Sequence, residues 1–249
     1  MYKKLLLLLT LSVSSIFAEI VSHKSMVALN EHIAQEKYSP EDIIVIFDID
    51  NTIAHPKTEV GSDQWVDYQI KKLMTIGVCA EQAYQDLSPL YYELQHIIDL
   101  HLVEDMIPDL ITNLNNTGIS TLGLTARRHP LIDRTITQLE PLGITFSTLA
   151  DQELIIEDCM HPAVYKKGII FCGLNNKGEV LFYFLNKLNL RFKKIFFIDD
   201  KMHHLIKVEK AAQENGVEYV GIHYTQCLER VKNFNPEQAE RELLELIAV

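Results

Sequence analysis

The chain has 249 residues, of which 47% are hydrophobic and 8% aromatic, so it is long enough for one sizeable core plus a small insert and too apolar to be disordered. Acidic residues outnumber basic ones by 34 to 23, which gives a net charge of −11, and no segment rich in Lys and Arg stands out. This balance argues against a nucleic-acid-binding surface, and we therefore expect no nucleic-acid partner.

Residues 1–18 have the three-part layout of a secretory signal peptide. Lys3 and Lys4 precede an uncharged apolar stretch, which ends in small residues up to Ala18. This stretch is shorter than the roughly 20 residues of a membrane span, although an uncleaved anchor or a buried first helix is the alternative. We predict cleavage after Ala18, secretion through the inner membrane to the periplasm or the exterior, and no stable membrane insertion afterwards.

The four cysteines, Cys79, Cys159, Cys172 and Cys227, are widely and irregularly spaced. Export would permit disulfides, but this spacing indicates neither a zinc site nor a dense disulfide framework. The sequence leaves disulfides and buried free thiols as open alternatives.

The first elements predicted after the leader are a helix and a strand. Residues 24–37 carry apolar side chains at helical spacing. Residues 43–47, IIVIF, form an uninterrupted apolar run, which is typical of a strand buried on both faces of a parallel sheet.

The next segment is rich in long side chains and lacks strand-like runs. Residues 63–104 therefore predict two or three helices, with breaks near Gly77 and near Ser88 and Pro89. We interpret residues 59–104 as a small helical cap, inserted after the first strand.

Beyond residue 104, helices and short apolar strands alternate, which predicts right-handed crossovers and a parallel sheet covered on both faces. We thus predict an α/β fold, a doubly wound, Rossmann-like parallel sheet built from residues 19–58 and 105–249. The predicted strands are residues 119–125, 167–173, 193–200 and 217–224, and the predicted helices are residues 105–118, 127–143, 176–190, 201–216 and 235–249.

Acidic side chains follow two of the predicted strands. Asp48 and Asp50 come after the first strand, and Asp199 and Asp200 end a later one. Because ligands bind at the carboxyl ends of parallel strands, we expect these acids to form one cluster, whose mutual repulsion a hard divalent cation would relieve. Mg²⁺ suits such a site, since it takes oxygen ligands and shares its coordination with phosphate.

A phosphate would find further partners close by. Thr125 ends the second strand and offers a hydroxyl, the amides of the following turn point the same way, and Lys177 offers a positive charge at a helix start. Alone, each of these residues has an ordinary explanation, such as a helix cap or a solvated lysine.

In order, the segments DIDNT, LTAR, NNKGEVL and FIDDK resemble the four motifs of the haloacid dehalogenase (HAD) superfamily, in its phosphatase branch. The resemblance spans roughly residues 43–225 and extends to a poorly characterised group of secreted bacterial proteins of this superfamily. It implies an Mg²⁺-dependent phosphatase that acts on a small phosphorylated substrate through an aspartyl-phosphate intermediate.

The resemblance also implies a role for each matched residue. Asp48 is the nucleophile, and Asp50 is the general acid and base. Thr52 orients the loop of the nucleophile by hydrogen bonds. The phosphoryl group is held by Thr125, the amide of Ala126, and Lys177. The metal ligands are Asp48, Asp50 through its carbonyl, and Asp199, and Asp200 either binds the metal through water or steadies Lys177.

Two other functions fit the same motifs. A phosphotransferase or mutase would pass the phosphoryl group to another hydroxyl, and a secreted binding protein would retain only the fold. The sequence determines neither the substrate nor the oligomeric state.

Several other polar and aromatic residues have bland interpretations that we favour. His203 and His204 could enter a metal site, but we favour the first turn of a solvated helix, since Mg²⁺ prefers oxygen. Arg127, Arg128 and His129 lie close enough to the site to touch substrate, but we favour a solvated helix start for them. The aromatic residues of the insert, Trp65, Tyr68, Tyr84, Tyr91 and Tyr92, fit a small core slightly better than a substrate pocket.

Overall fold

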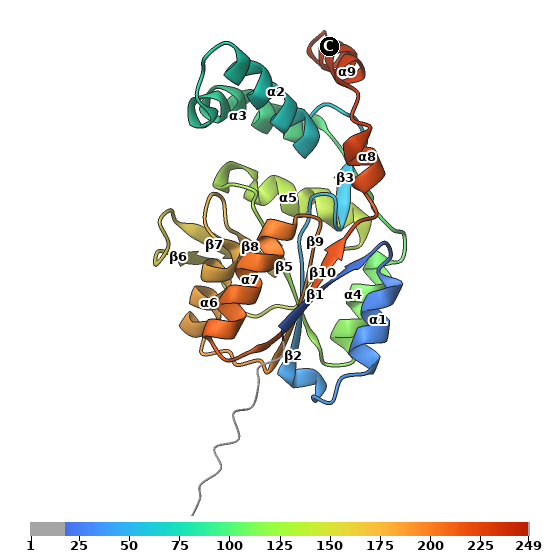
Figure 1. Cartoon of the computed structure of the whole chain (residues 1–249), viewed down its shortest axis with the longest axis vertical. Coiled ribbons are helices and arrows are strands. Elements are labelled where there is room, and N and C mark those ends of the chain that lie inside the picture. The colour runs from blue at the N-terminus through green and yellow to red at the C-terminus, as the bar shows by residue number, and fades with distance from the viewer. Residues whose placement is uncertain (1–17, 249) are drawn as a thin grey trace, which may run out of the picture.

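The apolar run at residues 43–47 forms a central strand, as predicted, in the computed structural model of the chain (Figure 1). The structure describes residues 18–248, so the predicted signal peptide lies outside the described residues except for Ala18. Ala18 begins the first strand, β1, which pairs with a strand close to the other end of the chain.

Eight strands form one sheet, in the order β1-β10-β9-β2-β5-β8-β7-β6. All neighbours from β1 to β8 pair in parallel, which confirms the predicted fold class. The strands are β1 (Ala18–His23), β2 (Ile43–Phe47), β5 (Ser120–Thr125), β6 (Leu154–Ile156), β7 (Ala163–Lys166), β8 (Ile169–Phe171), β9 (Lys194–Asp199) and β10 (Glu218–Tyr224).

The sheet is not parallel throughout, because β6, β7 and β8 form an antiparallel edge that the sequence did not predict. Lys167 and Gly168 join β7 to β8, with φ angles of 47° and 76°. Positive φ at both central residues is the signature of a tight hairpin turn, so the chain reverses here instead of crossing over.

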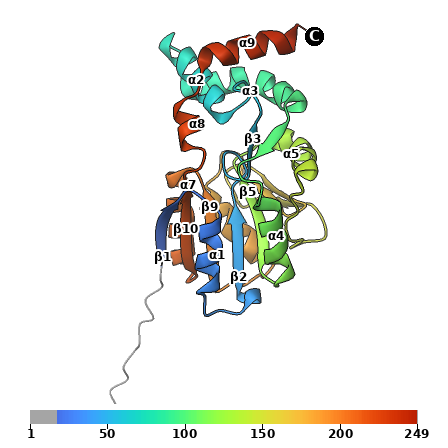
Figure 2. The same cartoon turned by 90° about the vertical axis from the view of Figure 1, so that its right-hand side faces the viewer.

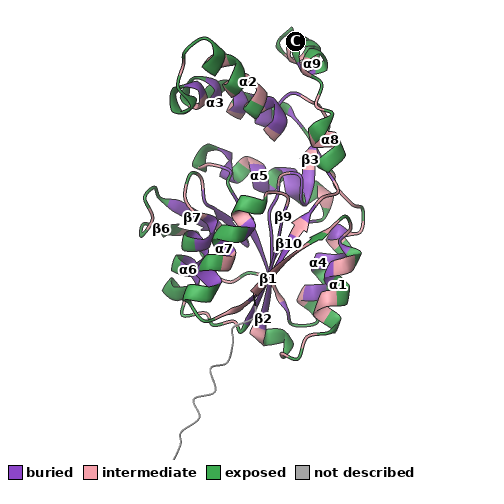
Figure 3. Ribbon diagram, in the orientation of Figure 1, coloured by how far each residue is buried: buried purple, intermediate pink, exposed green. Residues whose placement is uncertain are grey.

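Helices cover both faces of the sheet (Figure 3). Every residue of β2 is therefore buried, which explains why its sequence is apolar at every position. Ile44 and Ile46 pack on one face against α6 (Lys177–Lys187) and α7 (Met202–Glu214). The intervening residues of β2 point to the other face. That face is covered by α1 (Val27–Ala34), α4 (Ile107–Asn116) and α5 (Ile132–Leu139).

A second, smaller unit stands above the carboxyl ends of the parallel strands (Figure 1). It consists of α2 (Asp63–Thr75) and α3 (Ala80–Ile97), carried on an antiparallel ribbon of β3 (Ala54–Pro56) and β4 (Leu100–Leu102). This ribbon was not predicted. Three short 3-10 turns complete the described elements before the C-terminal segment: Pro40–Asp42, His129–Leu131 and Glu140–Leu142.

One predicted break in the insert is confirmed and the other is wrong. The chain turns at Gly77, which has a φ of 93°. In contrast, α3 continues through Pro89, although proline cannot donate to the carbonyl of Gln85 four residues earlier. The hydroxyl of Ser88 donates to that carbonyl at 3.1 Å, so the acceptor is satisfied and the helix persists.

The C-terminal segment, which sequence reasoning grouped with the core, packs against the insert (Figure 2). It comprises α8 (Leu228–Lys232) and α9 (Pro236–Ile247). Ala239 of α9 is buried in the same apolar cluster as Trp65 of α2 and Leu94 of α3. A carboxylate oxygen of Glu242 accepts hydrogen bonds from the loop that leads into α2. The C-terminal helix α9 therefore contributes part of the apolar core of the insert.

Among the helices that the structure describes, none combines the length and the apolar composition that crossing a membrane requires. The four cysteines are all unpaired thiols in the described part of the chain, and Cys172 and Cys227 are buried.

Candidate functional site

Three carboxylates meet where β2 and β9 end. The two strands run in parallel with Phe47 beside Ile198, so the following residues, Asp48 and Asp199, emerge next to each other. The amide of Asp48 donates to the carbonyl of Ile198 at 2.9 Å and fixes this register. One carboxylate oxygen each from Asp48, Asp199 and Asp200 lies within 4.8 Å of the others, a group that could hold a metal ion.

Lys177 bridges two of these acids from the first turn of α6. Its Nζ donates to Asp48 Oδ1 at 2.6 Å and to Asp199 Oδ2 at 2.8 Å. Only 1% of the lysine is exposed, so a solvated lysine at a helix start is ruled out. Although burial lowers the pKa of Lys177, the two carboxylates raise it above its ordinary value overall. The ammonium therefore remains charged inside the protein.

One lysine does not neutralise the cluster. Burial raises the pKa of Asp48 to about 7, against the attraction of Lys177 and with repulsion from Asp199. Burial and the charges of Asp48 and Asp199 raise the pKa of Asp200 to about 8. Burial opposes ionisation of Asp199 too, but Lys177 and a hydrogen bond with His204 bring its pKa to about 2.

A buried oxygen in this cluster also lacks a hydrogen-bond partner. Asp200 Oδ1 is such an atom among the described residues, and an unsatisfied buried oxygen is costly unless something binds it. Excess negative charge and an orphaned oxygen are what a hard cation with oxygen ligands would relieve. The residues present thus fit a divalent metal ion.

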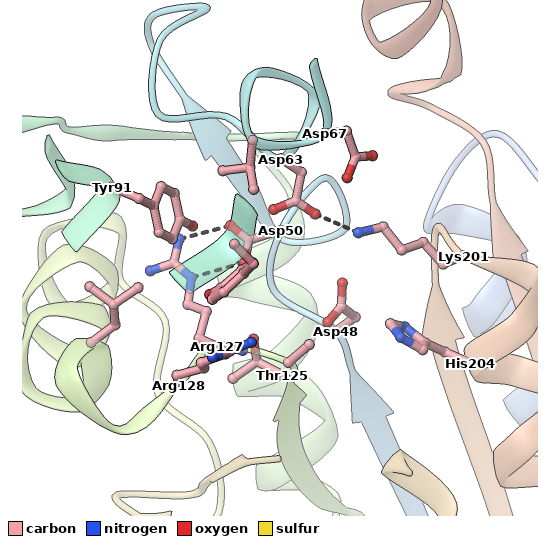
Figure 4. A pocket seen from close by; sticks show the side chains of 14 residues that line it. Asp48, Asp50, Asp63, Asp67, Tyr91, Thr125, Arg127, Arg128, Lys201 and His204 are labelled. Carbon is pink, nitrogen blue, oxygen red and sulfur yellow. Dashed lines mark hydrogen bonds and ion pairs between the residues drawn. The ribbon is translucent and has the colours of Figure 1, made fainter. Parts of the chain in front are cut away.

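Asp50 faces away from this cluster and binds a buried arginine (Figure 4). Arg127 donates to both Asp50 oxygens, with Nη2 to Oδ1 at 2.8 Å and Nε to Oδ2 at 2.9 Å. Its remaining nitrogen, Nη1, donates to Thr135 and to Gln138 of α5. Arg127 is only 5% exposed, so the prediction of a solvated helix start is wrong for this residue.

The loop between Asp50 and β3 is tight. Asn51 adopts a φ of 59°, and its amide donates to the carbonyl of Ala54. The Thr52 hydroxyl is buried without a hydrogen-bond partner among the described residues, so the hydrogen bonds expected of Thr52 are not formed by its side chain.

A cavity of about 160 Å³ opens above Asp48, between the sheet edge and the insert (Figure 4). Thr125, at the end of β5, is buried in its floor, and its Oγ1 accepts a hydrogen bond from the amide of Arg127 at 3.1 Å. Ala126 lies exposed beside it. The lining residues are Asp48, Asp50, Asp63, Val66, Asp67, Tyr84, Tyr91, Thr125, Ala126, Arg127, Arg128, Leu131, Lys201 and His204.

The insert and the core are tied together across this cavity. Lys201, next to the acidic pair, donates to Asp63 Oδ2 of α2 at 2.6 Å. The guanidinium carbon of Arg128 lies 3.7 Å from the ring centroid of Tyr84 in α3. Trp65 is buried in the core of the insert, whereas Tyr84 and Tyr91 line the cavity. The aromatic residues of the insert are therefore divided between its core and the cavity wall.

His204 takes part in the site, contrary to the expectation of a solvated helix. Its Nδ1 lies 3.0 Å from Asp199 Oδ2, and the residue lines the cavity. Burial lowers the pKa of His204 to about 4, so the imidazole is neutral at pH 7. His203 is largely exposed, in agreement with the expectation.

Residues 22–245 match the family described as "Protein of unknown function (DUF2608)". The chain belongs to this family. The match covers every residue of the cavity and of the carboxylate cluster, so the site lies within the DUF2608 domain.

Known proteins similar to this DUF2608 chain include chlamydial relatives. A protein of Chlamydia trachomatis named "Putative outer membrane protein" is 24% identical over 89% of this chain and 84% of its own length. One of the same name from Chlamydia pneumoniae is 26% identical over 75% of this chain and 71% of its own. A crystal structure titled as a putative phosphatase from Clostridium difficile covers 79% of this chain and 99% of its own, at 14% identity and a TM-score of 0.44.

The structure of this DUF2608 chain brings most residues of the predicted site to one edge of the sheet. Asp48, Asp199 and Asp200 form the cluster, Lys177 lies beneath it, and Thr125 lies beside it. Sequence reasoning considered Arg127, His204 and Tyr84 but favoured structural explanations for them, and it did not single out Asp63 or Lys201 as site residues. The available signal was position, since Arg127, Lys201 and His204 lie within about four residues of the ends of predicted strands.

Proposed function

We propose that this protein is a metal-dependent phosphatase of the HAD superfamily, which hydrolyses a small phosphomonoester on Asp48. Mg²⁺ is the metal that we assign to the carboxylates of Asp48, Asp199 and Asp200 and to the carbonyl of Asp50. The observation that carries the proposal is the convergence of three carboxylates, two of them buried, with Lys177 at a strand end where Asp48 lines a cavity of about 160 Å³.

The residues around the cavity divide the chemistry between them. A carboxylate oxygen of Asp48 forms a bond to phosphorus as the bond between phosphorus and the leaving oxygen breaks. Asp50 gives that oxygen a proton and later takes one from the water that attacks the aspartyl phosphate, which frees Asp48 and inorganic phosphate. Because Asp50 is paired with Arg127 in the structure, its carboxyl group must leave this pair to act on the substrate.

Hydrogen-bond donors, one of them positively charged, complement the charge that spreads over the phosphoryl oxygens in the transition state. Thr125, the amide of Ala126 and Lys177 would hold these oxygens. A bound Mg²⁺ would add a fixed positive charge and offset the repulsion between an anionic substrate and the acidic cluster. The insert, residues 59–104, would act as a cap that keeps water from the reacting group and selects the leaving group.

The first experiment is turnover of a panel of small phosphomonoesters by the purified protein. We expect hydrolysis with Mg²⁺, none after chelation with EDTA, and recovery when Mg²⁺ is restored. Asp48→Asn should abolish turnover, whereas Asp151→Asn, a change at an exposed loop residue, should not. Activity that survives both chelation and Asp48→Asn would contradict the proposal.

Product analysis separates hydrolysis from phosphoryl transfer. We expect inorganic phosphate as the main product even when an alcohol acceptor is added. Stoichiometric transfer to the alcohol would indicate the phosphotransferase alternative. A complete lack of turnover over the panel, with the fold intact by circular dichroism, would favour a binding protein.

We also propose that the mature protein is exported, with residues 1–18 removed. Cell fractionation and N-terminal sequencing of the native protein test this proposal. A mature protein that retains Lys3 and Lys4 would contradict it.

A further inference from the structure

Arg128 presents a guanidinium group to the cavity from the loop after β5 (Figure 4). The group lies against the ring of Tyr84, with its central carbon 3.7 Å from the ring centroid. Such stacking uses the face of the guanidinium and leaves the N–H groups along its edge free to bind. The tyrosine of the insert therefore holds the arginine of the core as a preformed donor.

The other cationic side chains that line the cavity are already paired with acids. Arg127 binds both oxygens of Asp50, and Lys201 binds Asp63. Among the described residues, no carboxylate lies within ion-pair distance of Arg128. Arg128 is thus the lining cation whose charge the protein does not itself neutralise.

The acids of the insert lie on the other side of the cavity. Asp63 and Asp67 project from α2 toward Lys201, away from Arg128 (Figure 4). Since Asp63 is paired with Lys201, the negative charge left on that side is that of Asp67, which would repel an anionic group on a bound molecule, whereas Arg128 would attract it. The cavity, at about 160 Å³, lies below the range typical of drug-sized ligands, so this group must be close to the reacting phosphate.

We propose that the substrates are small phosphomonoesters whose leaving group carries a second anionic group, a carboxylate or a phosphate, which Arg128 binds. Arg128 suits either chemistry, because its planar edge donates two parallel hydrogen bonds to paired oxygens. This inference rests on the proposed phosphatase function and deepens it, since it assigns a determinant of substrate choice.

A matched series of three-carbon substrates tests the proposal. The purified protein is assayed on 3-phosphonooxypropanoate, on 1,3-propanediol bisphosphate and on 3-hydroxypropyl phosphate, whose far end is neutral. We expect kcat/KM to be about 10- to 100-fold higher for at least one anionic substrate than for the neutral one, as hydrogen bonds to charged groups predict. The two anionic substrates distinguish a carboxylate from a phosphate.

Arg128→Gln should remove that preference, because it should lower kcat/KM far more for the anionic substrates than for the neutral one, which offers Arg128 no anionic group. Tyr84→Phe keeps the ring and should keep the preference, whereas Tyr84→Leu should reduce it. An equal loss on all three substrates would mean that Arg128 serves the transferred phosphate or docks the insert, and it would overturn the proposal. A preference that Arg128→Gln leaves unchanged, or no preference at all, would also overturn it.

Binding measurements make failure of this inference distinguishable from failure of the phosphatase function. In Asp48→Asn protein, calorimetry measures the Kd of each substrate without turnover. Tighter binding of the anionic substrates that disappears with Arg128→Gln supports the inference, even if no turnover is found. Equal binding of all three refutes it, even if the protein is an active phosphatase. Urea unfolding of each variant confirms that the fold is intact.

Discussion

The buried lysine of the site makes a direct prediction about stability. Lys177→Met removes the ammonium but keeps a long side chain of similar volume, so packing changes little. Asp48 and Asp199 then remain buried with no cation between them. In the metal-free protein, we expect this substitution to lower the free energy of unfolding substantially.

The size of the effect follows from the burial of the three groups. The side chains of Lys177, Asp48 and Asp199 are 1%, 8% and 0% exposed, so water screens the pair very little. Removing one partner of a buried ion pair typically destabilises by about 3–5 kcal/mol, because a charge stays buried and uncompensated. A loss of this size is a large part of the roughly 5–15 kcal/mol that stabilises a typical domain.

Urea unfolding with EDTA, followed by circular dichroism, measures this loss. The matched control is Lys72→Met, since Lys72 pairs with Glu240 on the surface, at 3.1 Å, and should leave the midpoint nearly unchanged. Excess Mg²⁺ should restore much of the stability that Lys177→Met loses, because the metal ion supplies positive charge at the same carboxylates. A loss no greater than that of the control would refute this account.

A double variant covers the case in which Lys177→Met fails to fold. Asp48→Asn removes one of the stranded charges, so the pair Asp48→Asn and Lys177→Met should be more stable than Lys177→Met alone. If the double variant is the less stable of the two, the ion pair does not dominate the energetics of the site.

Three further predictions concern the packing and charges around the core. Gly178→Ala should destabilise the protein by about 1–3 kcal/mol in urea unfolding, because the added methyl group would meet the carbonyl of Lys207 in the adjacent helix. Partial burial raises the pKa of Glu218, but the hydrogen bond from Tyr38 and nearby lysines lower it overall. Glu218→Gln should therefore destabilise at pH 7, and the difference should shrink as the pH falls from the ordinary Glu pKa through the lowered pKa of the folded state, below which the carboxylate is protonated in both states. Glu242→Ala should speed hydrogen exchange in the loop that leads into α2, whose amides bind this carboxylate.

Each of these predictions has a control or an outcome that would contradict it. Gly216→Ala meets no nearby atom and separates the backbone strain of a positive φ from the packing clash at Gly178. If the loss of unfolding free energy caused by Glu218→Gln grows as the pH falls, the pKa of Glu218 is not lowered in the folded state. Exchange in the loop that rises equally with Glu245→Ala would show that α9 as a whole, and not Glu242, protects it.

The central elements of the fold could be predicted because their signals are local. An apolar run buried on both faces identifies β2 without knowledge of its neighbours, and the acids at its end follow directly. The antiparallel edge at β6 and β7 was harder, because these strands have only three and four residues and depend on the turn at Gly168. The predicted break at Pro89 was wrong because the backbone hydrogen bond that proline cannot make is replaced by one from the hydroxyl of Ser88. Such a side-chain contact is not visible in the sequence pattern.

The site divides in the same way. Asp48, Thr125, Lys177 and Asp199 stand at strand ends or a helix start, and parallel pairing brings such positions together by rule. The ion pair of Asp50 with Arg127 joins residues 77 positions apart, and burial of that arginine depends on α5 beneath it.

The sequence by itself determined the type and order of the central strands and helices and the acids that end them, because apolar runs, helical spacing and strand-end chemistry are properties of short segments. Only the tertiary structure decided which charges meet. It paired Arg127 with Asp50, buried Lys177 between two carboxylates, and packed the last helix on the insert. These outcomes depend on distances between distant segments, and the free energy of a charge depends on its surroundings, which no local pattern encodes.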